Sequence, residues 1–220
     1  MKVENYLSKI SQEKISNAVT EAEKKINAEI VPVFMMSCDG YTEAGLRGAI
    51  LGAATTSLSI LVYDHLMGWY QLFLLRNDWL FVASIALGGL LGYILFGEIS
   101  LLKRFMLSKQ KMKQRSTAMA ERVFGEYKLV ETQSRTGILI FVSLFERKIE
   151  IIPDKGLKDK IADDEWQKVI DEMVPALKRK AFDDAFLSSI AKVTEILLAY
   201  KMEREGDSPN ELPDHLRENI

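Results

Sequence analysis

The sequence is poor in the residues that most often build catalytic and zinc centres. Its 220 residues include one cysteine, Cys38, and two histidines, His65 and His215. A single cysteine excludes an internal disulfide framework. So few histidines disfavour zinc sites of the histidine–cysteine type and nucleophiles that a histidine activates. We interpret Cys38 as a small structural thiol.

Two sequence patterns are also missing. No GxxxxGK[ST] run is present, which excludes a phosphate-binding loop of the P-loop type. The N-terminal stretch MKVENYLSKISQEKISNAVTEAEKK is polar, has a helical pattern and lacks the apolar core of a signal peptide. We therefore expect any membrane insertion to come from an internal segment.

Charge is nearly absent from the middle of the chain. Between residues 48 and 97 the only charged side chains are Asp64, Arg76 and Asp78. The run WLFVASIALGGLLGYILFG (79–97) has none, and residues 48–63 are uncharged but include serine and threonine. Roughly 20 apolar residues in a helix cross a bilayer core. We predict a transmembrane hairpin with spans at about 46–63 and 79–97. The alternative is a buried helical hairpin of a soluble protein.

Both predicted spans contain a GxxxG spacing, Gly48–Gly52 in the first and Gly88–Gly92 in the second. Small residues at this spacing let helix backbones approach closely. The pattern predicts a tight hairpin, and it also suits homo-oligomers that form through the spans.

Lysine and arginine are distributed unevenly around the hairpin. Seven lie in the 20 residues before residue 48 and the 20 after residue 97, against one, Arg76, in the connecting loop. The positive-inside rule then predicts a two-span protein of the bacterial inner (plasma) membrane with both termini in the cytosol.

Six of these seven cations belong to a basic stretch, residues 103–115. They can attract anionic lipid at roughly 1 kcal/mol per residue, although positive-inside topology alone explains them. Little aromatic interleaving means that nucleic-acid binding is not expected.

The two flanks contain the elements of one α/β domain, a small sheet sandwiched by helices. We expect an amphipathic N-terminal helix capped by Ser11, an edge strand at 29–37 with Pro32, and a continuous helix that carries the basic stretch. Further on, we expect a central strand at 137–144, a strand at 148–156, a helix capped by Asp163 or Asp164, and a last helix at about 183–202.

The predicted organisation inserts the hairpin into this domain. The parts are 1–45, first part of the cytosolic domain; 46–100, transmembrane hairpin; 101–115, basic helical stalk; 116–202, second part of the domain; and 203–220, a polar, loosely ordered tail.

Several segments of the flanks resemble the TPM domain family. These are INAEIVPVFMMS (26–37), AERVFGEYKL (120–129), RTGILIFVSLFERKIEIIPDKGL (135–157), Trp166, KRKAFDDAFLSSI (178–190) and PNELPDHL (209–216). The resemblance covers about 15–37 and 116–200. It implies an α/β sandwich, together with an accessory role in membrane complexes, acid phosphatase activity or a bound divalent metal. It carries over most directly to Glu29, Arg135, Asp154 and Trp166, of which Trp166 is expected in the core. Many members have a signal peptide and one terminal anchor, whereas the hairpin here is internal.

Carboxylates are the remaining candidates for chemistry. Asp154, Asp39 and Glu29 flank predicted strands, and oxygen ligands of this kind suit Mg²⁺ or Ca²⁺. If strand 29–37 pairs beside strand 148–154, Asp39 and Asp154 converge at one sheet edge. Asp154 is the candidate catalytic residue. The alternatives are a turn role for Asp154 and a surface or salt-bridging role for Glu29.

The first functional hypothesis is a membrane-anchored accessory factor that interacts with the lipid bilayer and with other membrane proteins. The alternative is a divalent-metal-dependent phosphatase that uses carboxylates around Asp154, with Mg²⁺ or Ca²⁺ as its ion. A transporter is disfavoured, because two spans without a buried ionisable residue provide no pathway unless the protein oligomerises.

Overall fold

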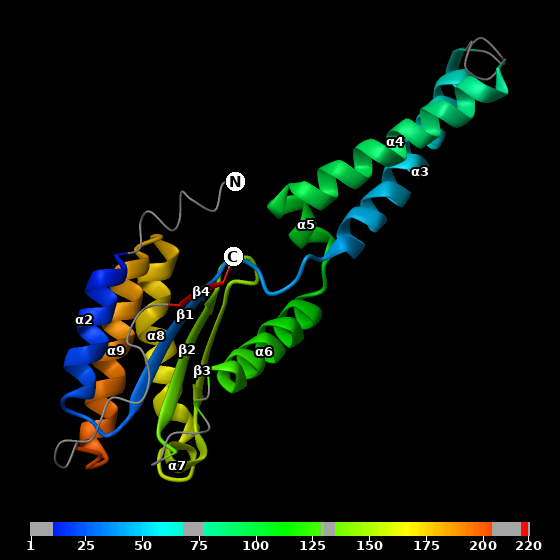
Figure 1. The fold of residues 1–220 in the computed structure, drawn as a ribbon. Coiled ribbons are helices and arrows are strands. Elements are labelled where there is room, and N and C mark those ends of the chain that lie inside the picture. Colours follow the sequence, from blue (N-terminus) through cyan, green and yellow to red (C-terminus); the bar gives the residue numbers. More distant parts are fainter. Residues whose placement is uncertain (1–10, 68–76, 128, 130–134, 204–216, 220) are drawn as a thin grey trace. The chain divides into compact units, whose positions relative to one another are not determined.

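The computed structural model describes residues 11–67, 77–127, 129, 135–203 and 217–219. The chain forms two compact units (Figure 1). The first combines Met1–Cys38 with Lys113–Ile220, and the second is Asp39–Met112. The second unit is therefore an insertion between two segments that fold together.

A four-stranded mixed sheet forms the centre of the first unit. Its strands are β1 (Glu29–Met35), β2 (Gly137–Ser143), β3 (Lys148–Pro153) and β4 (Arg217–Asn219), in the order β3-β2-β1-β4. β1 is parallel to β2 and to β4, and β2 is antiparallel to β3. All seven residues of β2 are buried, which confirms its prediction as a central strand.

The edge position predicted from Pro32 holds for the first half of β1. β4 pairs only with Val33 to Met35, so Pro32 lies just outside that ladder.

The pairing of β4 also brings the end of the chain into the sheet. The expectation of a loosely ordered tail is therefore wrong for residues 217–219, whereas residues 204–216 lie outside the described part.

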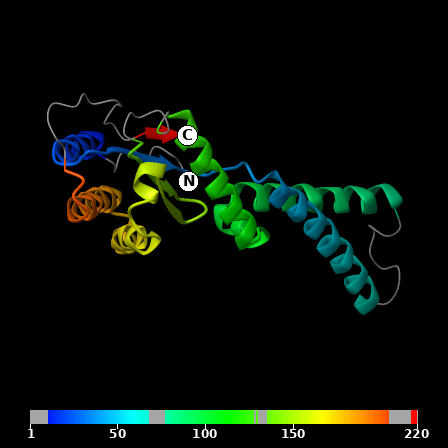
Figure 2. The ribbon, with the colours of Figure 1, turned by 90° about the horizontal axis from the view of Figure 1, so that it is seen from below.

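Three helices cover one face of the sheet, α2 (Gln12–Glu23), α8 (Asp163–Lys178) and α9 (Phe182–Ala199). Figures 1 and 2 show them as one layer. Alternate residues of the strands, such as Phe34 and Ile140, join this core, and the ring of Phe34 packs edge-on against Phe182 with centroids 5.3 Å apart. Trp166 is buried in the same core, as predicted.

The other face of the sheet packs on α6 (Lys109–Glu126). Val123 and Phe124 of this helix share a second core with Val33 and Phe141. Two helical layers around one mixed sheet confirm the predicted α/β class. A short helix, α7 (Lys155–Lys158), follows β3.

The two predicted helix caps differ in detail. Ser11 is the N-cap of α2, but its side chain makes no capping bond, and its amide donates instead to Asp183 Oδ1 at 2.9 Å. The N-cap of α8 is Ala162, so the prediction that Asp163 or Asp164 caps this helix is wrong. Both acids lie in the first turn, where the helix dipole favours negative charge.

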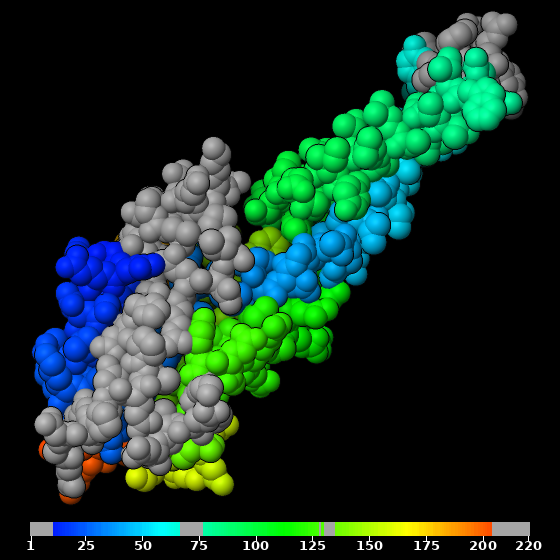
Figure 3. Space-filling view, viewed as in Figure 1, coloured from blue at the N-terminus to red at the C-terminus, as the bar shows by residue number. Residues whose placement is uncertain are grey.

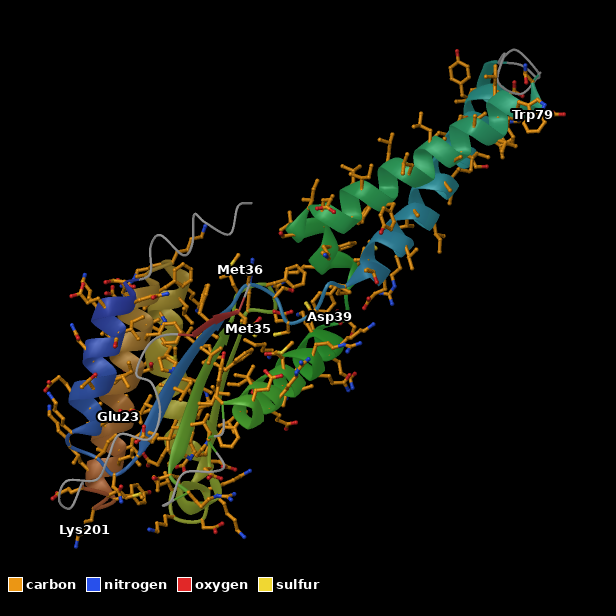
Figure 4. All side chains as sticks on the ribbon, viewed as in Figure 1. Glu23, Met35, Met36, Asp39, Trp79 and Lys201 are labelled. Carbon is orange, nitrogen blue, oxygen red and sulfur yellow. The ribbon has the colours of Figure 1, made fainter. Side chains whose placement is uncertain are left out.

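The inserted unit contains α3 (Thr42–Met67), α4 (Asp78–Glu98) and α5 (Ser100–Met106). By length and composition α3 and α4 are each able to cross a membrane. Arg76, in the loop between them, lies outside the described residues. Figure 4 shows Trp79 at the loop end of the hairpin.

The predicted continuous helix after the hairpin is wrong. Extended backbone at Ile99 separates α4 from α5, and extended backbone at Leu107 separates α5 from α6. Three helices therefore replace one, and α5 is a separate seven-residue segment.

Candidate functional site

Asp154 lies at the end of β3 and is 4% exposed. The guanidinium of Arg135 donates to both of its oxygens, from Nε to Oδ2 at 2.8 Å and from Nη2 to Oδ1 at 3.3 Å. The Lys155 amide donates to Oδ1 at 2.7 Å, which makes Asp154 the N-cap of α7. The carboxylate thus connects the start of β2 to the end of β3. This structural role is close to the turn role that the sequence analysis gives as the alternative to catalysis.

The other two predicted ligands lie at opposite ends of the sheet. Glu29 is paired in register with Gly137, whose carbonyl accepts a hydrogen bond from the Asp154 amide at 2.8 Å. Glu29 and Asp154 therefore lie at the same end of the sheet, where β1 and β2 begin and β3 finishes. Asp39 follows the other end of β1, beyond Met35 and Met36 (Figure 4). The expectation that strand 29–37 pairs beside strand 148–154 is wrong, because β2 lies between them and β3 runs antiparallel to β1. The ends of β1 and β3 therefore point in opposite directions.

These placements do not provide one metal site. Among the residues that the structure describes, no three His, Cys, Asp or Glu side chains are grouped so that they can hold an ion. The predicted set of Asp154, Asp39 and Glu29 therefore does not fit a shared Mg²⁺ or Ca²⁺ ion, and we derive no chemistry through one.

A second buried polar cluster, unpredicted from the sequence, lies where β1 and β2 end. Glu146 is 3% exposed. Its Oε1 accepts the Cys38 amide at 2.9 Å and the Ser37 hydroxyl at 3.4 Å, and its Oε2 accepts the Ser143 hydroxyl. The cluster fixes the last residues of β1 directly before the chain leaves for the inserted unit.

The thiol of Cys38 belongs to this cluster and donates to Ser143 Oγ at 3.3 Å. Burial, together with the nearby Glu146 carboxylate, raises the pKa of Cys38 to about 12, although the Ser143 hydroxyl opposes this. A thiol with so high a pKa is protonated at neutral pH and is a poor nucleophile. This agrees with the interpretation of Cys38 as a structural thiol.

Nothing in the local sequence FER (145–147) distinguishes Glu146 from an ordinary turn residue. A carboxylate flanked by apolar and basic residues in a turn usually faces water. Its burial depends on the parallel pairing of β1 and β2, which joins residues more than 100 positions apart.

The hairpin helices contact each other through the glycines of the two GxxxG spacings. A Cβ atom added at Gly52 would lie 2.2 Å from the Gly88 carbonyl oxygen, and one at Gly92 would lie 2.2 Å from the Gly48 carbonyl oxygen. Figure 2 shows the two helices separating toward the loop end. These four glycines therefore form the contact between the two helices, as the tight-hairpin prediction requires.

The outer surface of the hairpin is apolar. Exposed side chains on α3 and α4 include Ile50, Leu58, Leu61, Val82, Leu87 and Leu90. In the span of α4 only 6% of the residues are buried inside the protein. Figure 3 shows one face of this surface.

The TPM domain family model matches residues 105–196. This segment of the chain therefore contains a TPM domain. The matched segment includes all of α6, then β2, β3, α7 and α8, and most of α9.

The chain is also similar to a solved structure, the NMR structure of the BA42 protein from the psychrophilic bacterium Bizionia argentinensis. The two share 16% identity with a TM-score of 0.57, and the alignment covers 96% of this chain and 95% of that one. At this identity the match supports the fold alone. A search of curated proteins gave no match.

The matched segment lacks β1, which nevertheless pairs along its whole length with β2. The sheet of this TPM domain is therefore completed by a strand from before the insertion. Cys38, the last residue of that segment, is bound by Glu146 of the matched segment.

Proposed function

We propose that this TPM domain protein is a membrane-anchored accessory factor that binds and supports other membrane proteins. The observation that carries the proposal is the hairpin, whose glycines face inward and whose leucines, isoleucines and valines face outward. A surface helix of a soluble protein normally has a polar face. The exposed side of α4 is apolar instead, which is what a lipid environment requires.

The exposure of α3 and α4 argues against the alternative of a buried soluble hairpin. Core helices are mostly buried, whereas 17% of the α3 span and 6% of the α4 span are. The excess of lysine and arginine outside the spans supports a plasma-membrane location with both termini in the cytosol.

The accessory role is supported by what the buried carboxylates contact. Asp154 binds Arg135 and caps α7, and Glu146 binds the end of β1. Both groups are used in holding elements of the fold together. We therefore assign the domain a binding role and not chemistry at these two carboxylates.

Affinity purification of the full chain from cross-linked membranes tests the proposal. We expect one or more membrane proteins to co-purify reproducibly, and to be lost when the cross-linker is replaced by its inactive analogue. Reproducible recovery of the chain alone would contradict the accessory role.

A parallel assay tests the phosphatase alternative. The detergent-solubilised protein is incubated with a phosphomonoester in Mg²⁺, Ca²⁺ or chelator, beside Asp154→Asn. We expect no turnover above background in either protein. Metal-dependent turnover that a folded Asp154→Asn variant lacks would replace our proposal with the enzymatic one.

A further inference from the structure

We propose that α5 is an interfacial helix that inserts Leu101 and Phe105 into a bilayer surface, and that Lys103 of α5 and Lys109 at the start of α6 bind anionic phospholipid headgroups. This inference rests on the proposed membrane hairpin. It adds that the end of the hairpin opposite the connecting loop, here called its base, binds anionic phospholipids.

Two large apolar side chains of α5 are strongly exposed on one face of the helix. Leu101 and Phe105 are four residues apart, so they lie on the same face of the helix. They are 74% and 80% exposed, which makes them among the most exposed large apolar side chains described. Neither is covered within the described part of the chain. A pair this exposed, continuous in sequence with the apolar span of α4, is typical of a helix that lies in a membrane interface.

The position of α5 is fixed against the base of the hairpin. The single extended residue Ile99 turns the chain out of α4 and into α5. At the other end of α5, the Arg47 guanidinium of α3 donates to the Met106 carbonyl. The helix is therefore held at both ends and does not depend on its own short length for its orientation.

The charges of the inserted unit select the lipid. At the base of the hairpin the cations are Arg47, Lys103, Arg104, Lys109 and Lys111, against the acids Asp39, Glu43 and Glu98. Lys111 forms an ion pair with Glu43. Among the described residues, Lys103 and Lys109 have no acidic partner, so both amines remain available for a headgroup phosphate. At the loop end the sequence has two acids, Asp64 and Asp78, and one cation, Arg76, which lies outside the described residues. This asymmetry directs the base toward the anionic cytoplasmic leaflet.

The test uses the full chain with Cys38→Ala and one new cysteine that carries an environment-sensitive fluorophore. The labelled positions are Phe105 on α5, Leu90 on the exposed side of α4, and Glu121 on the exposed side of α6. Each protein is reconstituted into vesicles of phosphatidylcholine alone or with phosphatidylglycerol, with brominated lipid as quencher. We expect emission at 90 and 105 to be blue-shifted and quenched, and emission at 121 to be water-like. Quenching at 105 should increase with phosphatidylglycerol.

A charge variant makes the lipid specificity testable without a probe on α5. In Lys103→Gln with Lys109→Gln, the preference of the protein for spin-labelled phosphatidylglycerol over phosphatidylcholine should fall by about twofold or more. In 1 M salt, where the Debye length is about 3 Å, the unmodified protein should lose the same preference. The control variant Lys158→Gln with Lys160→Gln changes two exposed lysines beyond β3. It should have the same preference for phosphatidylglycerol as the unmodified protein.

The outcomes separate this inference from the proposed function. Quenching at 90 with a water-like probe at 105 would overturn the role of α5 and leave the membrane hairpin intact. A blue-shifted but unquenched probe at 105 would mean that protein covers this face, and would also overturn it. An unchanged lipid preference in the charge variant would overturn the headgroup assignment. Absence of quenching at 90 would contradict the proposed function itself.

Discussion

Gly52 of α3 and Gly88 of α4 lie so close together that a Cβ atom added at Gly52 would be 2.2 Å from the Gly88 carbonyl oxygen. That oxygen belongs to the backbone and cannot rotate away as a flexible side chain can. The contact therefore requires glycine and determines how closely the hairpin arms approach.

Gly52→Ala should separate the arms and destabilise the hairpin by about 1–3 kcal/mol, the usual cost of overpacking. Gly125→Ala is the matched control, because a Cβ at this position in α6 meets nothing within 4 Å. The control should be neutral or stabilising, since alanine is the better helix former. Thermal unfolding of both variants in detergent measures the difference. Equal midpoints would show that the glycine contact does not hold the hairpin.

The Asp154 carboxylate should contribute to stability through two separable contacts. Asp154→Ala removes the cap of α7 and the ion pair with Arg135, and we expect a loss of about 2–4 kcal/mol. Asp154→Asn keeps a capping oxygen and should lose about 1–2 kcal/mol, since the Arg135 side chain is half exposed and its charge is screened. Urea unfolding of the full chain in detergent tests this order. An unchanged free energy of unfolding in Asp154→Ala would exclude a structural role.

Glu146→Ala should destabilise the end of β1. It leaves the buried Cys38 amide without its acceptor, which costs about 1–3 kcal/mol. Glu126→Ala, which removes an exposed carboxylate from α6, should change the free energy of unfolding by less than about 0.5 kcal/mol. Hydrogen exchange of the Cys38 amide provides a local measurement, and faster exchange in Glu146→Ala is the expected result.

Much of this fold follows from pattern alone. The apolar run GILIFVS predicts a central strand because both faces of β2 are covered, and the GxxxG spacings predict the hairpin contact. The break at Ile99 has no such pattern, since no proline or glycine lies between residues 98 and 108.

The site was less predictable because it depends on strand order. The convergence of Asp39 and Asp154 required β1 to lie beside β3, and no local property of either strand specifies that β2 separates them. The same applies to Glu146, whose burial follows from the pairing of β1 with β2. The Arg135–Asp154 ion pair joins two residues that the family resemblance singled out separately.

Cys38 should make stability depend on pH above pH 9. Its pKa rises from 9.0 to about 12 on folding, so between these values the unfolded chain binds fewer protons than the folded one. The free energy of unfolding should therefore be unaffected by this thiol below pH 9. Above pH 9 it should decrease by up to about 1.4 kcal/mol per pH unit. The difference between the unmodified protein and Cys38→Ala isolates this effect from other titrating groups. A difference that does not vary with pH would contradict the raised pKa.

The most direct test of the account is the accessibility of single cysteines in intact cells. Asp78→Cys at the loop end of the hairpin and Glu121→Cys on α6 are each placed in a Cys38→Ala background, and bacterial spheroplasts are treated with a membrane-impermeant maleimide. If α3 and α4 span the plasma membrane with the TPM domain in the cytosol, the cysteine at 78 reacts in intact spheroplasts and the cysteine at 121 reacts only after lysis. If both react only after lysis, and alkaline carbonate releases the protein from the membrane fraction, the hairpin does not cross the bilayer.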